Sequence, residues 1–382
     1  MVTRRTLLAG SAAASASATA TLAWGSSAAA NGHAGIDLVW ASMANWLLRV
    51  GGVEILMDGY FTRLPESLFR QGPTGPLDLT THPVTPDVEM VRYVHARIGS
   101  YRSLDYVLTG HSHFDHSLDS TVWMDLTRAR LIGPRTTAYQ AIAWGTPARR
   151  CSIVEGGETL RLGSARVQVI RWNHSGNPGA LQHDPIELNA VPVPDPETGG
   201  LRAGVAEDFP TGGGGRAYLF TVQCGRREVS LLWMNSGSAV DLDVPIVVDG
   251  KDHGAPSANL AAALRRARID RVDLAVMPAS VEHLDRVLTI ARPRAVIPHH
   301  WDGLYQPFLS GMPFRFADPA YQATVAAHDA EMIVPDQFLD AWRLDTRGLR
   351  PTPNDAMRDL FDFPDPPAAA VAARTAVSCC GD

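Results

Sequence analysis

Three histidines and an aspartate lie within six consecutive residues, at 111–116 (HSHFDH). The apolar run just before them predicts a strand that delivers this polar group into a loop. Residues two apart on an extended segment share a face, so His111 and His113 can point at one position. Asp115 and His116 come after the turn and can point at a second position. Neutral imidazole is the commonest protein metal ligand, and a carboxylate suits a harder ion beside it. The spacing therefore predicts a metal site.

The elements that position this group alternate as in an α/β protein. Two apolar runs joined by Gly51-Gly52 predict a hairpin within residues 40–58, and Thr85 as N-cap with Pro86 after it predicts a helix start. Further helices are expected at 117–127, 257–268 and 281–291, and further strands at 129–132, 158–162, 165–171, 217–224, 228–233, 274–277 and 295–298. The four strands between 158 and 233 are expected to form a second sheet. Two sheets with helices on their outer faces predict a four-layer α/β/β/α domain.

The composition fits one globular domain with a sizeable core. Of the 382 residues, 45% are hydrophobic and 19% are charged, which is typical of a soluble protein. The net charge of −6 and the lack of a basic block argue against nucleic acid as a partner. We expect the domain to span residues 31–363 and to be followed by a disordered Ala/Pro-rich tail, 364–382.

The first thirty residues have the character of an export signal. Arg4-Arg5 precedes a stretch of Ala, Ser, Thr and Leu without acidic residues, and small residues close it at 28–30. The arginine pair resembles a twin-arginine signal, although Thr6-Leu7 departs from its commonest Phe-containing form. A membrane anchor is disfavoured because Ser and Thr dilute the apolar run, which stops short of a span. We therefore expect export to the periplasm or the medium, with the twin-arginine machinery as partner.

The four cysteines give no metal or redox motif. Cys151, Cys224 and the adjacent pair at 379–380 show no C-x-x-C spacing. An exported protein can oxidise its thiols, so a Cys151–Cys224 disulfide is compatible with the sequence, and spacing does not decide it.

One long insertion interrupts the regular pattern, at residues 177–215. It holds six prolines and ends in four glycines, and a loop of this length in a compact domain is functional or disordered. We expect it to form a wall or lid beside the metal site. His183 and Asp184 within it would then face the pocket, or else lie in solvent.

The HSHFDH segment is the H-x-H-x-D-H signature of the metallo-β-lactamase superfamily, and residues from about 36 to 342 resemble that family in order and spacing. The resemblance implies an αββα sandwich, a centre of one or two zinc ions or other divalent ions, and hydrolase activity. The ending at 297–301 (IPHHW) is similar to the lactonase and N-acylphosphatidylethanolamine phospholipase-like branches rather than to true β-lactamases.

The resemblance also implies the remaining ligands. His174 matches the family's third histidine, and with His111 and His113 it would leave one position open for water, as catalytic zinc sites do. His300 matches the last motif and would join Asp115 and His116, with His299 behind it, although the two could be reversed. Asp58 matches a carboxylate that supports the ligands, with a surface turn aspartate as the alternative.

Asn235 is where the sequence departs from the family. It stands at the position of the aspartate that bridges the two metals, and we expect it to be a weak ligand because an amide oxygen is neutral. The second metal would then bind more weakly, and Asn235→Asp would restore the bridge. Asp241 or Asp243 would replace the missing carboxylate only by a shift of several residues.

The chemistry that this site implies is metal-assisted hydrolysis of a small-molecule ester, lactone, amide or phosphodiester. Hydroxide on the metal would attack the substrate, and Asp115 would be the catalytic residue that orients it or moves its proton. The alternative is a catalytically silent, secreted protein that keeps the fold and metal as a binding module. The oligomeric state is left open.

The paired arginines give a direct test of export. Replacing Arg4 and Arg5 by Lys should strand the precursor in the cytoplasm, because twin-arginine recognition depends on the guanidinium pair. Cell fractionation and immunoblotting measure the outcome. Unchanged export of the double-Lys form would indicate the general secretory route.

Overall fold

The computed structural model describes residues 35–65, 83–174, 187–201, 214–236, 242–248, 250–365 and 369–370. All of the described residues belong to one compact unit, 33–382. The expected export signal, most of the expected tail, and several predicted residues lie outside the described residues: His183, Asp184, Asp241, Cys379 and Cys380.

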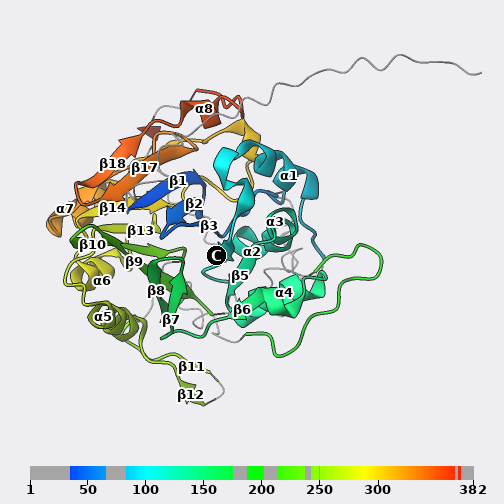
Figure 1. Cartoon of the computed structure of the whole chain (residues 1–382), viewed down its shortest axis with the longest axis horizontal. Coiled ribbons are helices and arrows are strands. Elements are labelled where there is room, and N and C mark those ends of the chain that lie inside the picture. Colours follow the sequence, from blue (N-terminus) through cyan, green and yellow to red (C-terminus); the bar gives the residue numbers. More distant parts are fainter. Residues whose placement is uncertain are drawn as a thin grey trace, which may run out of the picture. The chain divides into compact units, whose positions relative to one another are not determined.

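The first sheet has eight strands within the described part of unit 33–382 (Figure 1). Their order across the sheet is β18-β17-β1-β2-β3-β4-β5-β6. β1 to β3 form an antiparallel meander, and β3 to β6 pair in parallel. The strands are β1 (Ile36–Ser42), β2 (Asn45–Val50), β3 (Val53–Met57), β4 (Tyr106–Leu108), β5 (Arg130–Gly133), β6 (Cys151–Ile153), β17 (Asp340–Asp345) and β18 (Gly348–Thr352).

The second sheet has seven strands among the described residues, in the order β16-β14-β13-β10-β9-β8-β7. Antiparallel pairing joins β7 to β10, and parallel pairing joins β10, β13, β14 and β16. The strands are β7 (Thr159–Leu162), β8 (Ala165–Arg171), β9 (Arg216–Cys224), β10 (Arg227–Met234), β13 (Leu274–Pro278), β14 (Ala295–His299) and β16 (Glu331–Met332). This sheet contains the four strands that the sequence grouped together.

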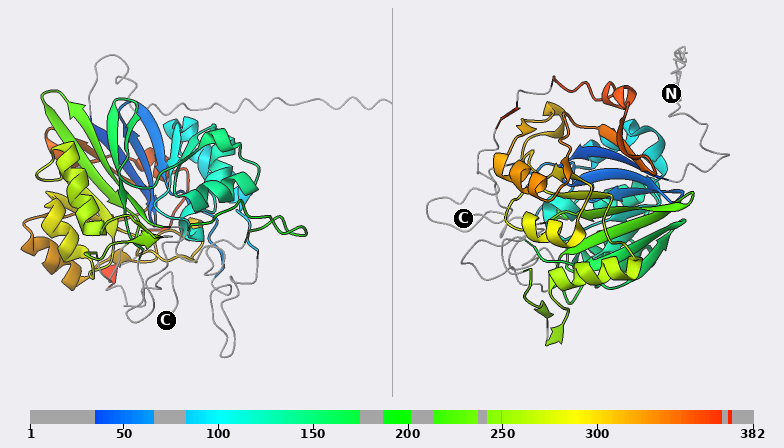
Figure 2. Two further views of the ribbon diagram at one scale, coloured as in Figure 1. Left: turned by 90° about the horizontal axis from the view of Figure 1, so that it is seen from below. Right: turned by 90° about the vertical axis from the view of Figure 1, so that its left-hand side faces the viewer.

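Helices cover the outer face of each sheet, as Figure 2 shows. The helices beside the first sheet are α1 (Val88–Arg97), α3 (Ser120–Thr127) and α4 (Arg135–Ala143), and those beside the second are α5 (Pro256–Ala267), α6 (Leu284–Ala291) and α7 (Pro319–Ala327). The apolar side chains between the sheets are almost fully buried. The predicted four-layer α/β/β/α fold is confirmed.

Besides three short 3-10 helices (Gly99–Ser103, Ala148–Arg150 and Phe308–Ser310), the described part of the chain has further small elements. They are α2 (Phe114–Ser117), α8 (Asp355–Arg358) and the two short strand pairs β11 (Val247–Val248) with β12 (Lys251–Asp252) and β15 (Arg315–Phe316) with β19 (Ala369–Ala370). None of the described helices combines the length and the apolar character needed to cross a bilayer.

Three predicted helix starts are wrong, and one of them belongs to the helix expected at 281–291, which begins at Leu284. The helix expected to be capped by Thr85 begins at Val88, because the Asp87 carboxylate caps it by accepting a hydrogen bond from Met90 N at 2.9 Å. The helix expected at 117–127 is divided into α2 and α3, and the Asp119 carboxylate at the junction accepts from Phe61 N at 2.6 Å. The hydrophobic periodicity of a sequence does not show that a buried carboxylate will accept hydrogen bonds from a distant loop, so it did not predict this break.

The turn between β1 and β2 forms hydrogen bonds to two loops that lead to the predicted metal site. Asn45 Oδ1 accepts from Gly59 N and Tyr60 N, both at 2.9 Å, and its Nδ2 donates to Tyr60 O at 2.7 Å. On the other side of this turn, Met43 N donates to the Asp302 carboxylate at 2.9 Å. The loop after β3 and the loop after β14 are therefore both fixed to one turn.

Loss of the Asn45 amide should be costly. Asn45→Ala leaves two buried backbone N–H groups without their acceptor, so we expect it to lower the free energy of unfolding by about 2–4 kcal/mol. Asn354→Ala is the control, since its buried amide donates one backbone bond, to Leu339 O, and should cost about 1 kcal/mol. Urea unfolding followed by tryptophan fluorescence gives both values. Equal losses would contradict the role given to Asn45.

Candidate metal centre

The predicted ligands all follow strands, and the fold brings the ends of those strands together. His111 and His113 follow β4, His174 follows β8, and His300 follows β14. β8 and β14 run in the same direction within the second sheet, so their carboxyl ends lie at one edge. Ligand sites of open α/β sheets form at such carboxyl edges.

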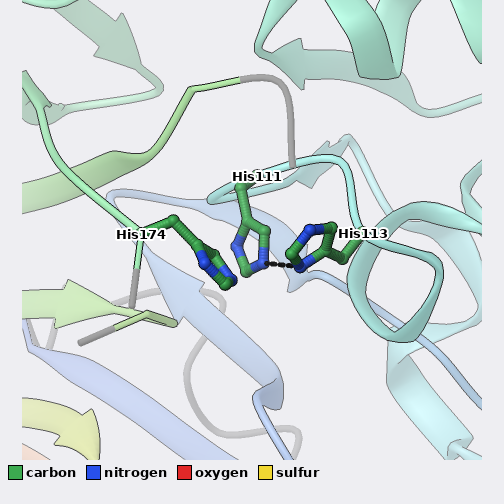
Figure 3. A group of neighbouring side chains, drawn as sticks. All are labelled: His111, His113 and His174. Carbon is green, nitrogen blue, oxygen red and sulfur yellow. Dashed lines mark hydrogen bonds between the residues drawn. The ribbon is translucent and has the colours of Figure 1, made fainter. Parts of the chain in front are cut away.

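The first group of ligands, the three-histidine cluster, consists of His111, His113 and His174. One ring nitrogen from each lies within 4.8 Å of the other two, and all three residues are buried. Figure 3 shows the rings turned toward one another, with His111 Nε2 3.2 Å from His113 Nδ1. Two nitrogens bound to zinc at about 2.0–2.1 Å in a tetrahedral site lie about 3.3 Å apart. The spacing of the two rings therefore fits a shared zinc-sized ion.

The second group, the aspartate cluster, consists of Asp115, His116 and His300. Asp115 Oδ2 lies 3.1 Å from His116 Nε2 and 3.0 Å from His300 Nε2. The two clusters adjoin, since the ring centroids of His111 and His116 are 4.0 Å apart. His116 Nε2 is buried, and the polar atom beside it is the Asp115 carboxylate oxygen that also faces His300. A carboxylate with two imidazoles fits a divalent cation.

The electrostatics of the clusters suit cation binding. Burial, together with the neighbouring His116 and His174, holds the pKa of His111 well below its usual value, so this ring is neutral. Burial opposes protonation of His116, but Asp115 and Asp58 outweigh it and raise its pKa to about 10. Burial also opposes ionisation of Asp115, but the adjacent His116 and His300 hold its pKa well below the usual range. The carboxylates that hold a proton on His116 would also stabilise a metal ion.

Asp58 lies behind the clusters, in a buried position that excludes the surface turn considered above. It accepts from His116 Nδ1 at 2.7 Å and from Gly110 N at 3.1 Å. It also accepts from Asn235 Nδ2 at 2.9 Å. Metal-ligating histidines commonly donate their second ring nitrogen to a carboxylate in this way.

Asn235 lies in a different place from the one expected of a bridging ligand. Its Oδ1 is 3.1 Å from His111 Nδ1, the nitrogen on the side of the ring away from His113. Its Nδ2 faces Asp58 and lies 3.1 Å from His116 Nδ1. The amide therefore contacts the Nδ1 atoms of His111 and His116, and it lies behind the clusters rather than between them.

The ambiguity between the last two histidines is resolved by their hydrogen bonds. Trp46 Nε1 donates to His299 Nδ1 at 2.9 Å, which leaves His299 Nε2 to donate to Met234 O at 2.9 Å. Both nitrogens of His299 are therefore occupied. His300 has a left-handed backbone, with φ of 65°, and its ring lies beside Asp115.

A buried cluster of three charged residues, which the sequence did not reveal, joins the strands before and after the insertion. Glu187 Oε1 accepts from Arg171 Nη1 at 2.8 Å and from Arg216 Nη2 at 2.5 Å. Its Oε2 accepts from Arg135 N, the first residue of α4, at 2.6 Å. Arg171 ends β8, three residues before His174, so this group fixes the strand that delivers His174. The sequence does contain a signal for this cluster, because Arg171 ends the buried strand β8 and Arg216 begins the buried strand β9.

The other candidates lie away from the centre or outside the described residues. Asp243 is paired with Arg286 at the surface, and Cys151 and Cys224 are free thiols, so the disulfide is not formed. The expected pocket residues of the insertion, and Asp241, belong to the undescribed segments.

Comparison with known proteins finds partial relatives. No family model matches the chain. A UPF0173 protein of Pyrococcus abyssi is 28% identical over 140 residues, which are 36% of this chain. A UPF0173 protein of Pyrococcus furiosus is 29% identical over a segment of the same length. In each case the match spans about half of the relative, 50% of its length.

Several solved structures resemble this one at low sequence identity. Igni18, a metallo hydrolase from Ignicoccus hospitalis, has a TM-score of 0.45 at 14% identity, covering 81% of this chain and 99% of its own. An isothiocyanate hydrolase from Delia radicum gut bacteria has a TM-score of 0.45 at 11% identity, covering 79% and 97%. The metallo-β-lactamase fold protein YhfI from Bacillus subtilis has a TM-score of 0.41 at 10% identity, covering 81% and 99%.

The two clusters predict separable metal losses. His111→Ala and His300→Ala should each remove about one zinc ion per chain from protein that is saturated at about two, because each variant deletes one of three ligands. Elemental analysis after dialysis against limiting zinc measures this. His328→Ala is the control, since His328 pairs with Asp285 away from both clusters. Full zinc content in both ligand variants would contradict the assignment.

Proposed function

We propose that this chain is an exported hydrolase that uses zinc or a similar divalent ion to cleave a small-molecule ester, lactone, amide or phosphodiester. The observation that carries the proposal is the pair of adjoining clusters, each with three ligands. A structural zinc site is closed by four protein ligands, whereas a catalytic site keeps a position open for water or substrate. Two open sites in contact suit hydrolysis, in which a nucleophile and a polarised substrate must meet.

The six candidate ligands form two metal-binding positions. His111, His113 and His174 would hold one ion, and Asp115, His116 and His300 the other. A divalent ion held there would lower the pKa of a coordinated water from ~15.7 to about 7 and would so supply hydroxide at neutral pH.

Asp115 is the residue that orients the attacking water. Its Oδ2 lies between His116 and His300, at 3.1 and 3.0 Å, so the carboxylate is held on both sides. A fixed carboxylate beside the attacking water would take the proton that the water loses on becoming hydroxide and would pass it to the leaving group. Of the two ligands that flank it, His300 has the more exposed side chain, at 15% against 1% for His116, so the carboxylate is more accessible on the side of His300.

The export part of the proposal has a separate basis. It is supported by the Arg4-Arg5 pair and the apolar, acid-free stretch after it. Twin-arginine export carries folded proteins, so the metal would be loaded before translocation.

A substrate panel on zinc-loaded protein tests the activity. We expect turnover of at least one of a lactone, a phosphodiester, a β-lactam, an aryl sulfate and a thioester, with loss of that turnover on chelation. His174→Ala should abolish it, and Asp115→Asn should lower kcat by about 100-fold or more. His328→Ala should be unchanged. Full metal loading without turnover of any substrate would favour the binding module instead.

A further inference from the structure

The Asn235 amide is buried behind both clusters, and its surroundings determine its orientation. Asp58 is a carboxylate and only accepts hydrogen bonds, so the amide must present its NH₂ group to it. The distances from Nδ2 to the two Asp58 oxygens are 3.1 and 2.9 Å. The amide oxygen is thereby turned toward His111 Nδ1, at 3.1 Å.

This orientation determines which nitrogen of His111 carries the proton. An amide oxygen only accepts, so His111 Nδ1 must be the donor, and Nε2 of the neutral ring keeps its lone pair. That lone pair is on the nitrogen that lies 3.2 Å from His113 Nδ1, inside the three-histidine cluster. The amide thus leaves His111 in the tautomer that a metal requires.

The same group acts on the second cluster through Asp58. His116 Nδ1 donates to Asp58 Oδ2 at 2.7 Å, which directs His116 Nε2 toward Asp115. Asn235 and Gly110 N occupy the remaining contacts of the Asp58 carboxylate. One amide therefore orients one ligand in each cluster, His111 directly and His116 through the carboxylate.

The site is shaped around this amide. A Cβ atom at Gly110 would collide with the Asn235 side chain, so only glycine allows the amide to lie against the backbone that leads into the metal loop. An aspartate at 235 would retain the size of the side chain but lose its N–H donor. It would also bring a second carboxylate oxygen to about 3 Å from Asp58, where two buried anions repel each other.

We propose that Asn235 is a positioning residue that sets the tautomers of His111 and, through Asp58, His116, and that it is not a metal ligand. This inference rests on the proposed metal-dependent function and deepens it. It reverses the expectation from the motif alone, because Asn235→Asp weakens metal binding here instead of restoring a bridge.

Metal affinity separates the two roles. Zinc and cobalt are titrated into apoprotein against a competing chelator for the natural protein, Asn235→Asp and Asn235→Leu. Loss of a residue that orients a ligand typically weakens metal binding about 10- to 100-fold, and we expect both variants to show this. Asn354→Leu, which removes a buried amide elsewhere, is the control and should keep the natural affinity. The visible spectrum of the cobalt protein should change in the Asn235 variants alone.

A measurement on the natural protein makes the test independent of variant folding. In ¹⁵N-labelled zinc-loaded protein, His111 and His116 should each show a protonated Nδ1 and an unprotonated Nε2. An unprotonated Nδ1 on His111, or tighter metal binding by Asn235→Asp, would overturn the inference while leaving the metal site intact. Natural protein that binds no metal would instead overturn the proposed function itself.

Discussion

One buried carboxylate, Asp58, determines how the metal centre is assembled. It follows β3 in a left-handed conformation, with φ of 57°, and accepts hydrogen bonds from Gly110, His116 and Asn235. These donors come from the loop after β4, from α2 and from the end of β10. A buried charge is tolerated only where such donors surround it, so the three segments cannot move independently. Both sheets are thereby joined at the point where the ligands converge.

The turn between β1 and β2 stabilises the loops on either side of this centre through buried hydrogen bonds. Asn45 fixes the backbone just after Asp58, and Met43 is bound by the Asp302 carboxylate beside the last ligand loop. Ligands on loops gain precision when the loops are anchored by buried hydrogen bonds, since metal binding tolerates only small displacements. The four-layer core supplies rigid strands, and these side-chain contacts transfer that rigidity to the loops.

A second anchor serves the remaining ligand, His174. Glu187 joins Arg171 and Arg216 with the first turn of α4, and burial together with Arg216 lowers the pKa of Arg171 to about 10. Breaking a buried ion pair leaves an uncompensated charge, so this group holds the ends of β8 and β9 firmly together. Each ligand loop is thus fixed by its own buried polar contact.

The sequence alone determined what depends on local geometry. The alternation along an extended segment places His111 and His113 on one side, and the Gly51-Gly52 turn and the apolar runs specify the hairpin and the two sheets. The start of α1 and the break before α3 were missed because side chains of Asp87 and Asp119 decide them. Tertiary structure also decided between His299 and His300, since Trp46 occupies the first. The position of Asn235 was readable from its motif, but whether its amide faces an ion or supports the ligands depends on Asp58, 177 residues away in the chain.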